Sequence, residues 1–166
     1  MRSTARPLTV VCIGLLIAVA AAQAAGSVQV SYVQPDSFAD VGDTRRDTEG
    51  NLLALTRHFE ALAGRLGDGQ KLTVEVLDVD LAGEIRPLHR MQQDVRVLRG
   101  AADWPRIKLR YTLESPGQAA RSGEQRLADM AYLQRINRYR SDEPLRYEKH
   151  MLDEWFVAQI AAAGAR

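Results

Sequence analysis

Two aspartates separated by one residue are the side chains in this chain best placed for chemistry. Asp78 and Asp80 lie in the β-branched stretch Lys71–Gly83. Alternate residues of a strand share a face, so the two carboxylates would lie close enough to hold a divalent cation or to divide acid and base roles. With Asp103 or Asp129 as a third ligand, this pattern would be that of a metal-assisted hydrolase.

A ladder of charges on neighbouring strands explains the same aspartates without catalysis. Lys108 and Arg110 have the same alternate spacing on another predicted strand, and opposite charges on paired strands stabilise each other. The sequence also has no glycine-rich phosphate loop, no nucleophile elbow and no pair of histidines spaced for zinc. We therefore favour the ladder, and we expect neither a catalytic residue nor a cofactor.

Basic residues are concentrated in the segment that follows the aspartates. The range 86–110 holds seven basic and two acidic residues. This segregation indicates either an arginine-rich binding face or neighbouring segments that neutralise one another, and we favour the second explanation. If the face exists, we expect Arg96, Arg99, Trp104 and Arg106 to bind a protein or an anionic envelope component.

Trp104 has two interpretations, because a tryptophan in a loop either covers the core or contacts a partner. Pro105 holds Trp104 in an extended conformation at the entry to a strand with alternate apolar residues. A large ring at this point would cover the open end of the sheet. We therefore favour a lid on the core.

The first 24 residues have the pattern of a secretory signal peptide. Arg2 and Arg6 precede an apolar run, and the small residues of Ala22–Ala24 form a cleavage site. The run is short for a membrane-spanning helix. We expect cleavage after Ala24, a single domain over residues 25–166, a periplasmic or secreted location, and no transmembrane segment in the mature chain.

The composition is that of one globular domain without disulfides. The chain has 166 residues, of which 46% are hydrophobic and 26% are charged. Cys12, the only cysteine, lies in the predicted signal peptide. Loss of Arg2 and Arg6 would leave 20 basic against 21 acidic residues, so the mature chain has no excess positive charge with which to bind nucleic acid.

Apolar periodicity predicts two helices. The first spans about residues 51–66, carries Leu55 and Phe59 on its apolar stripe, and turns His58 to solvent. The second begins at a cap formed by Ser141 or Asp142 and closes the core with the adjacent pair Trp155–Phe156. Residues 129–140 remain undecided between helix and loop, with three apolar residues at helical spacing among many arginines.

Alternating patterns predict strands at about residues 28–33, 71–81, 95–98, 107–113 and 118–127. In the second strand the apolar phase switches at Val76–Leu77. A bulge there would turn Asp78 and Asp80 to solvent, whereas an unbroken strand would place them beside Val74. We favour the bulge because carboxylates are rarely buried without a partner.

The order of these elements predicts an α+β fold. We expect a single domain with a mostly antiparallel sheet of four to five strands and two main helices packed on one face. This arrangement buries both helical stripes and leaves the other face of the sheet in water.

The chain resembles a known family along almost its whole mature length. The resemblance is carried by the segments SYVQPDSFAD, LTVEVLDVDLAGEI, VRVLRGAADWPRIKLRYTL, LADMAYL and YEKHMLDEWF. These resemble the bacterial secreted family catalogued as domain of unknown function 3016. Its characteristic motifs are matched by Asp80–Gly83, Trp104–Arg106, Glu148–Lys149 and Trp155–Phe156. The family has no established activity, so the resemblance implies an exported single domain and no catalytic residue.

Export and the missing catalytic motifs together predict a non-enzymatic protein of the cell envelope. Such a protein would bind another protein or an envelope component. The metal-assisted hydrolase that would use Asp78 and Asp80 is the alternative hypothesis.

Overall fold

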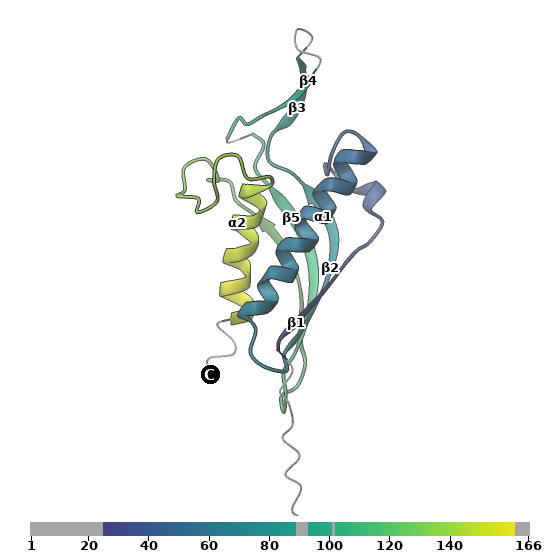
Figure 1. Cartoon of the computed structure of the whole chain (residues 1–166), viewed down its shortest axis with the longest axis vertical. Helices are drawn as coiled ribbons and strands as arrows, with labels where there is room; N and C mark the ends of the chain where they lie inside the picture. Colours follow the sequence, from purple (N-terminus) through teal and green to yellow (C-terminus); the bar gives the residue numbers. More distant parts are fainter. Residues whose placement is uncertain (1–24, 89–92, 101, 162–166) are drawn as a thin grey trace, which may run out of the picture.

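The computed structural model describes residues 25–88, 93–100 and 102–161, and the predicted signal peptide lies outside them. The fold is α+β, as expected, with two helices on one face of a four-stranded sheet and a two-stranded arm projecting from one end (Figure 1). The main sheet has the order β1-β2-β5-β6, formed by Ser27–Tyr32, Lys71–Asp80, Arg106–Glu114 and Arg121–Ala128. The arm consists of β3 (Glu84–Leu88) and β4 (Gln93–Val97). Neither helix in the described part of the chain combines the length and apolarity needed to cross a membrane.

The main sheet has four strands and is mostly antiparallel, as predicted, but it contains one parallel pair, and β3 and β4 form a separate sheet. β1 runs parallel to β2, whereas β5 is antiparallel to both β2 and β6. The helix α1 (Arg45–Leu62) lies between β1 and β2 in the chain. This helical crossover returns the chain to the end of the sheet at which β1 begins. The adjacent strand β2 therefore runs parallel to β1.

The predicted bulge is present in β2. Val76 pairs with Leu109 and Asp78 pairs with Lys108, so Leu77 has no counterpart on β5. The extra residue changes the phase of the strand: Val76 and Val79 are both buried in the core, while Asp78 lies on the opposite face.

The helix α1 begins at Arg45, several residues before the predicted start. Thr44 is its N-cap, and the Thr44 hydroxyl accepts a hydrogen bond from the backbone N–H of Asp47 at 3.2 Å. The same hydroxyl donates to the Asp47 carboxylate at 2.6 Å. The apolar stripe from which the helix was predicted does not extend into this polar first turn, which the Thr44 cap stabilises. The helix ends at Leu62 and is followed by a 3-10 turn, Ala63–Arg65.

The helix α2 (Arg146–Trp155) begins later than predicted, and its cap was predicted wrongly. The N-cap is Leu145 in a left-handed conformation with φ of 54°, and no side chain caps the helix. Ser141 and Asp142 instead belong to the irregular chain before it. The helix continues into a π-helical turn, Phe156–Ile160.

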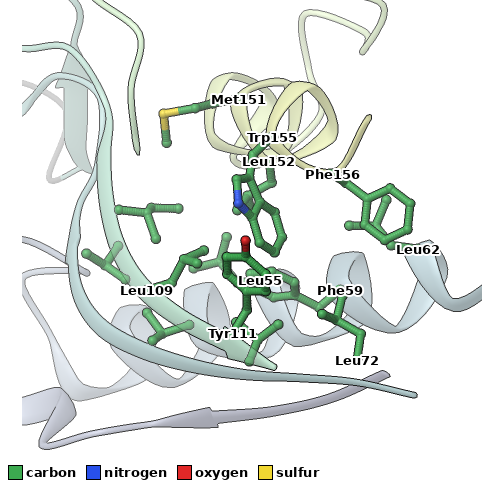
Figure 2. Close-up of a cluster of buried hydrophobic side chains, with 14 of the residues drawn as sticks. Leu55, Phe59, Leu62, Leu72, Leu109, Tyr111, Met151, Leu152, Trp155 and Phe156 are labelled. Atoms are coloured by element: carbon green, nitrogen blue, oxygen red, sulfur yellow. The ribbon is translucent and has the colours of Figure 1, made fainter. Parts of the chain in front are cut away.

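The core lies between the two helices and the sheet (Figure 2). The Trp155 ring meets the ring of Phe59 edge-on at a centroid distance of 6.4 Å, and that of Tyr111 at 5.7 Å. Trp155 and Phe156 are both buried, as predicted. Aromatic edge-to-face pairs of this kind add to the stabilisation from apolar burial.

Candidate functional site

The charged residues of greatest interest meet where β2 ends and the arm of β3 and β4 leaves the main sheet. We call this region the arm junction and define it by these residues: Asp40, Asp80, Ala82, Gly83, Arg96, Trp104, Arg106 and Glu148. They come from the loop before α1, the end of β2, the arm, the start of β5 and the first turn of α2.

Arg96 ties the arm to the body of the protein. Its Nη1 donates to Asp40 Oδ2 at 3.0 Å and to the carbonyl oxygens of Ala82 and Gly83 at 3.2 and 2.9 Å. Its Nη2 donates to Asp40 Oδ1 at 3.3 Å. Arg96 was a candidate binding residue in the sequence. In the structure, most of its N–H donors bind acceptors within the protein itself.

Glu148 is a buried carboxyl group at the same junction, only 2% exposed. Its Oε1 accepts a hydrogen bond from the backbone N–H of Ala82 at 2.8 Å. Burial raises the pKa of Glu148, while the N–H of Ala82, its own N–H and the charge of Arg96 oppose that rise. Sequence reasoning missed this residue as a site candidate, although it lies in a segment that carries the family resemblance.

Arg106 connects Asp80 to Trp104. Its Nε donates to Asp80 Oδ2 at 2.8 Å, and its Nη2 binds the same oxygen. The guanidinium carbon also lies 5.3 Å from the centroid of the Trp104 ring, in a cation–π contact.

Trp104 does not act as the predicted lid on the core. It is half-buried and lies outside the hydrophobic core and the residues that pack against it. The next residue, Pro105, is buried in its place. Trp104 therefore lies at the edge of the junction, in contact with Arg106.

The four aspartates of the hydrolase hypothesis have separate partners. Asp78 accepts from the N–H of Ala39 at 2.9 Å, and Asp80 pairs with Arg106. Asp103 accepts from the Tyr132 hydroxyl at 2.7 Å, while Asp129 accepts from the N–H of Ala131 at 3.1 Å. Within the ranges that the structure describes, no three His, Cys, Asp or Glu side chains gather as a group able to hold a metal.

A charge ladder does cross the open face of the sheet, but its partners differ from those predicted. Arg110 binds Glu75 at 2.9 Å and Glu124 at 3.1 Å, and Lys108 binds Glu124 at 2.9 Å. These contacts replace the expected pairing with Asp78 and Asp80. The register between β2 and β5 places Glu75 opposite Arg110, and β6 brings Glu124 to the other side of β5, next to both basic residues.

Asp153 is the centre of a second polar cluster, between α1, α2 and the preceding loop. This buried carboxylate accepts a hydrogen bond from the Tyr139 hydroxyl, pairs with Arg138, and lies 3.5 Å from Arg65. His58 Nε2 lies 3.4 Å from Asp153 but makes no hydrogen bond in the described structure. The prediction that His58 faces solvent is therefore wrong.

Burial is the largest influence on the pKa values of two residues in this cluster, His58 and Tyr139. It lowers the pKa of His58 despite the opposing charge of Asp153. Burial, aided by the hydrogen bond to Asp153, raises the pKa of Tyr139 to about 12. The cluster joins residues far apart in the chain, which no local spacing could have revealed.

The pocket beside the arm junction is small. It encloses about 260 Å³ and includes Arg96, Arg146, Tyr147 and Glu148 in its lining. Sites for small organic ligands commonly enclose about 300 to 1,000 Å³. This pocket therefore lies just below the usual range for a small organic ligand.

The fold and the junction define a single-domain α+β protein with a projecting two-stranded arm. The chain matches the family described as Protein of unknown function (DUF3016) over residues 26–158, and it belongs to that family. No curated protein and no solved structure matches the chain. The Asp80–Gly83, Trp104–Arg106 and Glu148–Lys149 segments, which carry the family resemblance, meet at the arm junction.

Proposed function

We propose that this protein is a non-enzymatic binding module of the bacterial cell envelope, periplasmic or secreted, and that its arm binds another protein. Export rests on the signal-peptide pattern of residues 1–24. The observation that carries the proposal is the open edge of the arm. In the described part of the chain, β3 and β4 pair with each other and with no other strand.

An open strand edge is suited to binding a partner by strand addition. Its outward N–H and C=O groups can pair with an extended segment of another protein. β3 contains Pro87, which has no backbone N–H, whereas β4 contains no proline. β4 is therefore the better docking edge.

The base of the arm is fixed before any partner binds. Arg96 binds the carbonyls of Ala82 and Gly83, and the N–H of Gly83 donates to the carbonyl of Asp103 at 3.0 Å. Gly83 has a φ of +84°, and a Cβ there would lie 2.8 Å from the carbonyl oxygen of Val97. A fixed base reduces the conformational entropy that binding would otherwise remove.

Of the arginines first considered, we keep only Arg99 as a residue available to a partner, and we add Arg86. Arg96 and Arg106 are engaged by Asp40 and Asp80. Arg86 and Arg99 lie at the arm, are more exposed than Arg96, and both contact Glu84, at 3.5 and 3.0 Å. We therefore expect these two arginines to border the protein-binding edge.

Site-specific photocrosslinking in cells tests the proposal. A photoreactive amino acid at Arg86 should capture a defined protein, whereas the same amino acid at the exposed Arg45 of α1 should not. The pair Arg86→Glu and Arg99→Glu should reduce capture by a probe at Val97, with unfolding unchanged. Equal capture from Arg86 and Arg45, or no capture from the arm, would overturn the proposal.

A further inference from the structure

The strand β6 forms one outer edge of the main sheet in the described part of the chain. It is the last strand in the order β1-β2-β5-β6 and pairs only with β5. The N–H and C=O groups on its other side can therefore form a ladder with a further strand. Whether a particular strand fits there depends on the side chains of β6.

Arg126 is an exposed charge on β6 that forms no ion pair with the residues that the structure describes. It lies directly opposite Lys108 of β5, and like charges at such positions repel each other. Glu124 lies on the same face of β6 but binds Lys108 and Arg110, at 2.9 and 3.1 Å. A carboxylate has about four acceptor sites, so Glu124 can accept a hydrogen bond from one more cation.

A second copy of β6 supplies an acid for Arg126 in one particular register. Opposite residues of an antiparallel pair share a face, so the two-fold axis of such a pair passes through a residue of β6. An axis at Gln125 places Glu124 of each copy opposite Arg126 of the other, so that the ion pair occurs twice. An axis at Glu124 or at Arg126 would instead place that charge against its own copy.

A cavity beside this edge has room for side chains of a second strand. It encloses about 340 Å³ between β6 and α2 and includes Gln125, Met151 and Trp155 in its lining. Trp155 is 4% exposed, and its indole N–H has no acceptor within the described structure. With the axis at Gln125, the two copies of this side chain lie side by side at the cavity. An amide oxygen there is a suitable acceptor for the indole N–H.

We propose that β6 pairs with β6 of a second copy of this chain, antiparallel and centred on Gln125. The resulting two-fold symmetric dimer joins two four-stranded sheets into one continuous sheet. It also carries two copies of the arm. The inference goes beyond the function proposed for the arm and does not depend on it, because β6 and the arm belong to separate sheets.

Sedimentation velocity of the mature chain from Ala25 onward tests the dimer and its charges. The unaltered chain should form a concentration-dependent dimer. Arg126→Glu and Glu124→Arg each place like charges at both ion pairs, so each variant alone should raise the dissociation constant about tenfold or more. Mixed in equal amounts, the two variants should form a heterodimer, because each supplies the charge that the other lacks. Arg45→Glu is the matched control, since it reverses an exposed charge on α1.

A cysteine at the two-fold axis tests the register, and it does so even if Glu124→Arg fails to fold after losing its contacts with Lys108 and Arg110. The only cysteine of the chain, Cys12, lies in the predicted signal peptide. Opposite residues of antiparallel strands have Cα atoms about 4.5 to 5.5 Å apart, which suits a disulfide. Gln125→Cys should therefore form an intermolecular disulfide under mild oxidation. Gln29→Cys is the control, because Gln29 is exposed on β1, the other outer strand of the sheet.

Four results would overturn the proposal. The first is an unaltered chain that stays monomeric at every concentration. The second is an Arg126→Glu variant that dimerises as strongly as the unaltered chain. The third is a mixture of the two folded charge variants that forms no more dimer than either variant alone. The fourth is disulfide formation that is no faster at Gln125→Cys than at Gln29→Cys.

Discussion

Arg96 should be among the most important polar side chains for the stability of this protein. It binds one carboxylate and two backbone carbonyls, all at 3.3 Å or less. Hydrogen bonds to a charged group contribute about 1.5 to 3 kcal/mol each when buried. Its side chain is 25% exposed, and Arg96→Ala would admit water to the vacated acceptors. We therefore discount the sum and expect a loss of about 3 kcal/mol in the free energy of unfolding.

A change at Asp40 separates the contribution of the ion pair to this loss from the contribution of the two carbonyl contacts. Asp40→Asn removes the ion pair but leaves both carbonyl contacts, so it should cost less than Arg96→Ala. In the double variant, the Asp40→Asn change should have little further effect, because its partner is already gone. The difference measures the coupling between Arg96 and Asp40.

The assay is urea unfolding followed by circular dichroism. The m-values are compared to confirm that unfolding exposes the same surface area in each variant. Arg45→Ala is the control, because Arg45 forms an exposed ion pair with Glu49 at 2.9 Å on α1. Exposed pairs of this kind contribute little. The reasoning fails if Arg96→Ala shifts the midpoint no more than Arg45→Ala does.

Two further predictions concern the arm junction. Burial raises the pKa of Glu148 in the folded state. Between the unfolded-state pKa of about 4.3 and the higher folded-state pKa, the folded protein keeps a proton that the unfolded chain has released. The stabilisation that this proton provides is complete below the unfolded-state pKa and is lost as the pH rises through the folded-state pKa. The unfolding free energy of the unaltered chain should thus fall relative to that of Glu148→Gln between pH 4 and the folded-state pKa; a constant difference in urea titrations would contradict this. Trp104→Ala should cost about 1 kcal/mol through its contact with Arg106, whereas Trp155→Ala should cost about 3 to 5 kcal/mol as a buried aromatic. Equal losses in unfolding free energy for the two variants would show that Trp104 contributes to stability as a core residue does.

The sequence predicted the features that depend on neighbouring residues. The switch of apolar phase in β2 correctly indicated the bulge at Leu77, because strand residues alternate between faces with a period of two. The apolar spacing around Phe59 identified α1 and its buried side. Trp155 and Phe156 were recognised as core residues because large adjacent aromatics need extensive burial.

The boundaries and pairing of these elements were predicted less well. The capping contact between Thr44 and Asp47 extends α1 beyond its apolar stripe, so the predicted start came too late. β3 was not predicted, because Gly83 and Pro87 indicated the end of the central strand. The order strand, helix, strand was compatible with a parallel pair, but adjacency of β1 and β2 was needed to establish it.

What the sequence by itself determined was therefore the local phase of its strands and helices, and the family to which the chain belongs. Only the tertiary structure decided what each charge contacts. Arg96 meets Asp40 across 56 residues, and Glu148 meets the backbone of Ala82 across 66. Such contacts depend on which chain segments the crossover and the helix packing bring together, and the spacing of residues along the chain does not record that arrangement.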